Sequence, residues 1–179
     1  MFFVSEIKTG APERFQTPLQ EKTYRALAQL GIPYERVDTD EAITMEDCVR
    51  IDAKLRVKMV KTLFLCDRRQ TAFYLLITVG DKPFSAKNFS AALEVSRVSF
   101  APSEKMETML GTRIGAATVF SALLDPENRV QIVFDKDVLA EEWYGCSDGT
   151  TTGYLKVRTD DILHGFLPFT RHAPKIAEV

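Results

Sequence analysis

The chain has 179 residues, of which 45% are hydrophobic and 27% charged, and its formal net charge is −2. These proportions are typical of one globular domain with a real core, and the slight acidic excess argues against a protein that neutralises many phosphates along a duplex. No apolar run approaches the ~18 residues of a membrane span, and the first residues lack the basic segment of a secretory signal, so we expect a cytoplasmic protein without membrane contact.

Helices and strands follow one another without a regular βαβ repeat. The first helix is bounded by a capping box from Thr17 to Gln20 and by Gly31 at its end. Two near-continuous apolar segments, 59–66 and 71–79, predict central strands covered on both faces. The other predicted elements are a strand at 34–38, a helix at 44–55 with a second capping pair (Thr44 and Asp47), a helix at 85–93, a strand at 97–100, a helix at 102–110, strands at 130–134 and 154–157, and a final helix capped at 159–161 and ending at 166. This order favours an α/β domain with a mixed sheet flanked by helices over a Rossmann fold or TIM barrel.

Most conventional catalytic centres are absent from the sequence. The two histidines, His164 and His172, lie near the C-terminus without a nucleophile-elbow motif, and we expect both on the solvated surface. The three cysteines are an odd count with wide spacing, which predicts reduced thiols rather than disulfides or a metal pair: Cys48, Cys66 and Cys146. No histidine lies near Cys146 in sequence to lower its pKa, so a packed thiol is the better interpretation. We expect neither a metal nor a cofactor.

Three segments remain as candidate sites, each with a structural alternative. Lys61 begins an apolar strand, where an ammonium suits the mouth of a cavity or an anionic partner, or else reaches water at the strand end. The glycines of segment 111–118 let backbone amides approach an oxyanion or phosphate, or else form a helix cap and a second turn. Segment 145–153 contains Asp-Gly and three threonines, which supply hydroxyls beside a tight turn, or only a hairpin.

Taken in order, these segments resemble the prolyl-tRNA editing (YbaK-like) family, which includes stand-alone ProX-type deacylases and the editing insert of bacterial prolyl-tRNA synthetase. The resemblance covers roughly residues 17–168. It is carried by LGIPYE at 30–35, the threonine-capped helix start at 44–47, KTLFL at 61–65, the glycine loop from Leu110 through Gly115, Thr118 and Leu123, and the stretches 150–155 and 161–163. We therefore predict a domain at 17–168, with a lead-in at 1–16 and a tail at 169–179.

The resemblance implies a compact domain with a mixed, partly barrel-like sheet, and a reaction in which water hydrolyses the ester between an amino acid and the terminal adenosine of tRNA. It implies the acceptor end of an aminoacylated tRNA as partner; the sequence leaves a monomer and a weak dimer open. The family's functional lysine falls on Lys61, as the catalytic residue. The residues expected to bind substrate are Thr62, Gly111, Gly115, Ala116, Thr118, Gly145, Asp148 and Thr150.

The sequence departs from the family pattern at three positions. Val119 replaces the usual proline of the glycine loop. Gly145 and Gly149 stand where many stand-alone members have a histidine and an asparagine. Smaller side chains there predict an enlarged or reshaped pocket, so the family's usual preference for alanine does not transfer, and loss of activity is the alternative.

Two other functions compete with deacylation. One is a non-catalytic module that binds tRNA or a nucleotide, and the other is a small-molecule hydrolase on the same fold, because a fold does not determine a function. The candidate contacts with the acceptor stem, chosen by their position in the sequence, are Lys58, Arg68, Arg69, Lys82 and Arg113.

Overall fold

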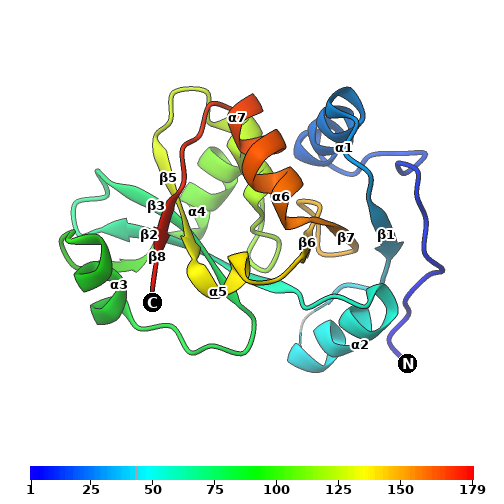
Figure 1. Cartoon of the computed structure of the whole chain (residues 1–179), viewed down its shortest axis with the longest axis horizontal. Coiled ribbons are helices and arrows are strands. Elements are labelled where there is room, and N and C mark those ends of the chain that lie inside the picture. Colours follow the sequence, from blue (N-terminus) through cyan, green and yellow to red (C-terminus); the bar gives the residue numbers. More distant parts are fainter. Residues whose placement is uncertain (43) are drawn as a thin grey trace.

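The computed structural model describes residues 1–42 and 44–179, which form two β-sheets with helices packed around them (Figure 1). The strands are β1 (Glu35–Asp38), β2 (Val60–Asp67), β3 (Phe73–Val79), β4 (Val98–Phe100), β5 (Val130–Asp135), β6 (Trp143–Ser147), β7 (Gly153–Arg158) and β8 (Lys175–Ala177). The longer helices are α1 (Pro18–Leu30), α2 (Met45–Leu55) and α3 (Ala86–Leu93). The shorter helical pieces are α4 (Ser103–Lys105) with η1 (Met106–Leu110), η2 (Val119–Leu124), α5 (Lys136–Leu139), and α6 (Thr159–Asp161) followed by η3 (Ile162–Phe166) and α7 (Leu167–Phe169).

The larger sheet is mixed, as predicted. Its strand order is β4-β2-β3-β5-β8; β2 runs antiparallel to β3 and β4, whereas β5 runs parallel to β3 and β8. The smaller sheet, β1-β7-β6, is antiparallel. A parallel bridge between Met59 and Gly145 joins the two sheets, which do not close into a barrel. In Figure 1 the larger sheet and α3 occupy the left half, and β1, β6, β7, α1 and α2 the right half.

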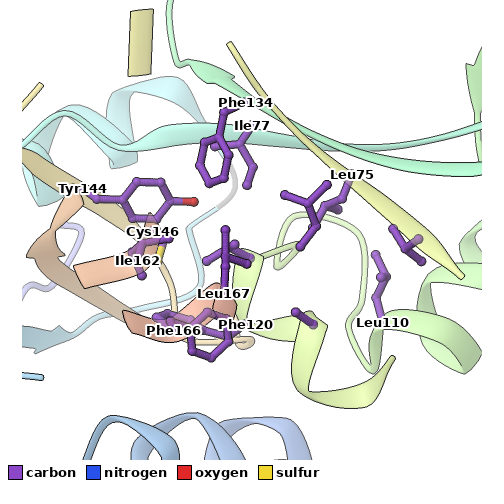
Figure 2. Close-up of a cluster of buried hydrophobic side chains, with 14 of the residues drawn as sticks. Leu75, Ile77, Leu110, Phe120, Phe134, Tyr144, Cys146, Ile162, Phe166 and Leu167 are labelled. Carbon is purple, nitrogen blue, oxygen red and sulfur yellow. The ribbon is translucent and has the colours of Figure 1, made fainter. Parts of the chain in front are cut away.

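The main core lies between the larger sheet and the C-terminal helical segment. Figure 2 shows Leu75 and Ile77 of β3 facing residues of β6 and of η3–α7. Alternate residues of β3, Tyr74 and Leu76, belong to a second cluster with Phe89 of α3. Successive side chains of a strand point to opposite faces, so β3 is covered on both of them, as predicted.

Capping explains where the first two long helices begin. The hydroxyl of Thr17 accepts from the backbone N–H of Gln20 at 3.0 Å, and Gly31 adopts a left-handed φ of 66° just after α1. The side chain of Gln20 accepts from the backbone N–H of Gln16 rather than of Thr17, so the predicted box is shifted by one residue. The box of α2 is complete, with reciprocal bonds between Thr44 and Asp47.

The C-terminal region differs from the prediction. Arg158 is the N-cap residue of α6, and Thr159 is the first helical residue, with no hydrogen-bond partner for its buried hydroxyl among the described residues. His164 is exposed, but the prediction of a surface position for His172 was wrong. The chain turns back after α7, so His172 is 5% exposed and its Nε2 lies 3.0 Å from Oδ2 of Asp125.

Both terminal segments pair with the sheets. Val4 and Lys8 form antiparallel bridges with Thr39 and Arg36 beside β1, and β8 adds the last strand of the larger sheet. The sequence analysis did not predict four of the observed elements: the strands β6 and β8 and the short helices η2 and α5. None of the described helices has the length and apolar character needed to cross a bilayer.

Candidate functional site

A cavity of about 1070 Å³ opens where the two sheets meet. Its walls come from the first half of β2, the face of α2, the glycine loop and the β6–β7 hairpin. The burial of β2 reflects this: residues 60–63 are only half-buried, whereas residues 64–66 are fully buried. The cavity takes the place of side-chain packing at that end of the strand.

Lys61 lies on the β2 wall of the cavity. It pairs with Thr78 in the β2–β3 ladder, and its ammonium donates a hydrogen bond to the backbone carbonyl of Lys82. No ion pair to Lys61 occurs within the described part of the chain. Of the sequence interpretations, the structure agrees with the position at a cavity: the lysine is half-buried there, and its partner is a neutral backbone oxygen instead of a carboxylate. Thr62 also lines the cavity.

A second polar wall comes from α2 and was missed by the sequence analysis. Thr44, Cys48 and Asp52 are spaced by four residues, which places them on one face of the helix, and all three line the cavity. Burial raises the pKa of Cys48, and the nearby carboxylates of Asp52 and Asp47 add to this effect. Burial likewise raises the pKa of Asp52, although the backbone N–H of Met59, at 3.0 Å from Oδ1, opposes the shift. The four-residue spacing was the signal that could have found this wall.

The glycine loop contributes to the cavity through its middle. Gly115, with a left-handed φ of 90°, lines the cavity beside Ile114 and Ala117. Gly111 caps η1 with a φ of 66°, and a Cβ there would lie 2.5 Å from Leu124 Cδ1. The other two loop residues expected to bind substrate are buried behind the wall: Ala116, and Thr118, whose hydroxyl donates to the carbonyl of Ser147 at 2.8 Å.

The glycines of the β6–β7 hairpin serve chain packing. A Cβ on Gly145 would lie 2.8 Å from Val57 Cγ1 and 3.2 Å from the Lys58 carbonyl, because β6 passes close to the segment that enters β2. A Cβ on Gly149 would lie 2.9 Å from Leu19 Cδ2. The sequence predicted an enlarged or reshaped pocket, and these contacts speak against enlargement: the space that the two glycines leave is filled by Val57, Met59 and Leu19.

The hairpin presents Cys146 and Ser147 to the cavity, with the other candidates behind them. Asp148 is buried and accepts hydrogen bonds from Gln20 Nε2 at 2.9 Å, the Tyr24 hydroxyl at 2.8 Å and the Thr150 hydroxyl at 2.7 Å. Burial raises the pKa of Cys146 well above its usual range, so this thiol is a poor nucleophile. Asp148 thus fixes the hairpin to α1, Thr150 bonds within the hairpin, and neither lines the cavity.

Of the basic residues considered for tRNA contact, two lie near the cavity mouth. Lys58 is exposed and lies 3.7 Å from Glu141, and Arg113 is exposed next to Ile114. Lys82 is held by Asp135 and Asp137, at 2.6 and 2.7 Å. Arg68 and Arg69 follow the far end of β2 from Lys61.

Part of the rim of the cavity is apolar. Val49, Phe100 and Ile114 line it and keep exposed fractions of 63%, 62% and 73%. Large side chains that stay exposed around a concave site mark a surface for a ligand. Among the described residues, no group of three or more histidine, cysteine or acidic side chains is arranged to hold a metal ion.

The fold is shared with solved structures. One is a protein proposed to be a trans-editing enzyme for prolyl-tRNA synthetase, with a TM-score of 0.63, 15% identity, and coverage of 92% of this chain and 99% of that one. A hypothetical protein matches with a TM-score of 0.65 and 16% identity over 87% of this chain and 98% of its own.

Curated relatives agree with this likeness. The prolyl-tRNA editing protein ProX of Acetoanaerobium sticklandii is 29% identical over 113 residues, which are 63% of this chain and 69% of ProX. The prolyl-tRNA synthetase associated domain-containing protein 1 of Danio rerio is 24% identical over 160 residues, 88% of this chain and 86% of its own. The family model of the aminoacyl-tRNA editing domain matches residues 39–164, which include β2, the glycine loop and the hairpin. The chain belongs to the aminoacyl-tRNA editing domain family.

Proposed function

We propose that this protein is a trans-acting deacylase that hydrolyses the 3′-terminal ester of a mischarged, tRNA-Pro-like aminoacyl-tRNA. The observation that carries the proposal is the position of Lys61, whose ammonium lies at the wall of a large cavity and has a neutral partner. An ammonium has three N–H donors. With one N–H directed at the Lys82 carbonyl, two remain for a substrate oxygen.

The reaction needs little from the protein beyond positioning and charge. A water oxygen attacks the ester carbonyl carbon, negative charge develops on the carbonyl oxygen, the bond to the ribose 3′-oxygen breaks, and that oxygen leaves with a proton. Lys61 stabilises the developing oxyanion, and the backbone near Gly115 supplies further donors at the same cavity. The 2′-hydroxyl of the substrate relays the proton, so the reaction needs no catalytic histidine.

The cavity suits the end of a charged tRNA. Its volume of about 1070 Å³ lies just above the usual range for ligand pockets, roughly 300–1,000 Å³, and leaves room for an amino acid with its adenosine. The aromatic ring of Phe100 at the rim offers a face on which a base can stack. The two basic residues near the mouth, Lys58 and Arg113, agree with contact limited to the acceptor end.

The test is deacylation of tRNAs charged with Ala, Ser, Cys, Thr or Pro by the wild type and by Lys61→Ala. We expect kcat/KM on the best substrate to fall about 100- to 1,000-fold in the variant, the usual effect of removing one oxyanion donor. Lys87→Ala, an exposed lysine of α3 outside the cavity, is the control and should keep full activity. Full deacylation by folded Lys61→Ala would contradict the mechanism. Binding of tRNA without turnover would favour a binding module, and turnover of simple esters without tRNA binding would favour a small-molecule hydrolase.

A further inference from the structure

Asp52 differs from the other carboxylates at the cavity. Oδ1 accepts the Met59 backbone N–H, and no hydrogen bond or ion pair to Oδ2 occurs within residues 1–42 and 44–179. The other acidic lining residues are either paired or at the exposed edge: Asp137 with Lys82, Glu141 with Lys58, and Asp81 in the exposed turn after β3. Asp52 is thus a partly buried acceptor fixed in place by one bond and open on its other side.

Neither lysine that lines the cavity forms an ion pair with Asp52 among the described residues. Lys61 donates to the Lys82 carbonyl, and Lys58 lies near Glu141. Burial raises the pKa of Asp52, and no basic side chain is among the causes that offset this effect. A carboxylate that has lost part of its hydration without gaining a counter-charge is stabilised by an arriving cation.

The proposed substrate carries such a cation. An aminoacyl ester has an α-amino group one carbon from the ester carbonyl, and this group is an ammonium at and below roughly neutral pH. The ester oxygen needs a positive partner and the amino group a negative one. The cavity supplies Lys61 on β2 and Asp52 on α2.

We infer that Asp52 binds the α-ammonium of the aminoacyl group and so selects esters with a free amino group over N-acylated ones. This inference rests on the proposed deacylation. Asp52 would act as a specificity-determining residue: an N-acyl group removes the positive charge, leaves the carboxylate unpaired and adds bulk at the α2 wall. Peptidyl esters, which are N-acylated, would then escape hydrolysis.

The experiment compares two substrates, the aminoacyl-tRNA that the wild type cleaves fastest and the same tRNA after N-acetylation. For the wild type we expect kcat/KM to be at least about 30-fold higher on the free amine, since an unpaired buried charge costs about 2–5 kcal/mol. Asp52→Asn keeps the size of the side chain and an oxygen for the Met59 N–H. It should lose about 30-fold or more on the free amine and change little on the acetylated ester, so that the discrimination nearly disappears. Glu46→Gln, the same charge change at an exposed position of α2, should retain the wild-type ratio.

Parallel losses on both substrates in Asp52→Asn would make Asp52 a structural residue and overturn the inference. Equal hydrolysis of both substrates by the wild type would also overturn the inference. This comparison needs no variant, so the inference can be tested even if Asp52→Asn does not fold. In both cases deacylation itself would stand. A wild type that cleaves neither substrate, nor any aminoacyl-tRNA of the panel, would instead contradict the proposed function and the inference with it.

Discussion

Among single residues, Tyr144 carries a polar group that the core does not satisfy. Its ring is fully buried 6.4 Å from that of Phe134, and its hydroxyl has no hydrogen-bond partner among the described residues (Figure 2). Burial of this hydroxyl raises the pKa of Tyr144 well above its usual range. A buried hydroxyl without a partner costs about 1–3 kcal/mol of folding free energy.

Replacing Tyr144 by Phe should therefore stabilise the protein, because the ring packing stays and the unsatisfied oxygen goes. We expect the free energy of unfolding to rise by about 1 kcal/mol, measured by urea unfolding with an unchanged m-value. The matched control is Tyr24→Phe, which removes a hydroxyl that donates to buried Asp148 at 2.8 Å. That change should lower the free energy of unfolding by about 2 kcal/mol. A loss of stability in Tyr144→Phe would show that its hydroxyl is satisfied.

At the level of elements, the β6–β7 hairpin depends on glycine where it meets β2. The Cβ of an alanine at 145 would lie 2.8 Å from Val57 Cγ1, 2.9 Å from Met59 Cε and 3.2 Å from the Lys58 carbonyl. The two side chains can shift, but the carbonyl belongs to the backbone that leads into β2. We expect Gly145→Ala to lower the free energy of unfolding by about 1–3 kcal/mol, as overpacking does.

Gly10→Ala is the control for this prediction, since nothing lies within 4 Å of an added Cβ and the position is exposed. Its effect should stay within about 0.5 kcal/mol. Thermal or urea unfolding of the two variants measures the difference. Equal free energies of unfolding for Gly145→Ala and Gly10→Ala would contradict the prediction, because they would mean that the backbone at the Lys58 carbonyl can move to make room for the added Cβ.

Elements with local signals were predictable, and those held by distant contacts were not. The limits of α1 and the start of α2 follow from capping residues, and the pair β2–β3 follows from its apolar runs. By contrast, β8 has three residues and exists because β5 offers a parallel edge. His172 is buried and contacts Asp125, 47 residues away in sequence. A sequence pattern within one segment cannot reveal contacts with residues that are this far away along the chain.

The candidate site divides in the same way. Lys61, Thr62 and Gly115, which were chosen from local sequence patterns and the family resemblance, line the cavity. The roles of the hairpin residues could not be predicted from the sequence, because they depend on distant neighbours. Gly145 packs against Val57, whereas Asp148 accepts hydrogen bonds from Gln20 and Tyr24. Whether the predicted residues bind substrate stays a prediction.

On the scale of the whole molecule, Lys82 joins parts of the chain that are far apart. Its ammonium lies 2.6 Å from Asp135 at the end of β5 and 2.7 Å from Asp137, and it donates to the backbone oxygen of Val179 at 2.9 Å. The Thr78 hydroxyl of β3 also donates to Asp135. Burial alone would raise the pKa of Asp135, but the hydrogen bonds from Lys82, Thr78 and the Asp137 backbone outweigh it, and this pKa is lowered.

This network predicts a loss of stability in acid. A carboxyl whose pKa is lower in the folded than in the unfolded state stabilises the fold above its unfolded pKa of about 3.9, and that contribution disappears as the pH falls through the folded value. Urea unfolding of the wild type should give a lower free energy of unfolding at pH 3 than at pH 7. In Asp135→Asn the difference between the two pH values should be smaller. The variant should also be less stable at pH 7 by about 3 kcal/mol, because it leaves Lys82 without its buried partner. Exposed Asp160→Asn should behave as wild type, and an unchanged pH dependence in Asp135→Asn would assign the acid sensitivity to other carboxyls.

The acceptor of the Lys61 ammonium is a backbone oxygen, which makes this contact tolerant of mutation. A side-chain partner can be lost in a single substitution, whereas a carbonyl is present whatever residue occupies position 82. Mutations on the α2 wall and at the rim can therefore accumulate and change which amino acid is accepted, while the ammonium keeps its anchor. If Lys61 acts as proposed, new substrate preferences become accessible in small steps, and in none of them does the ammonium lose this partner.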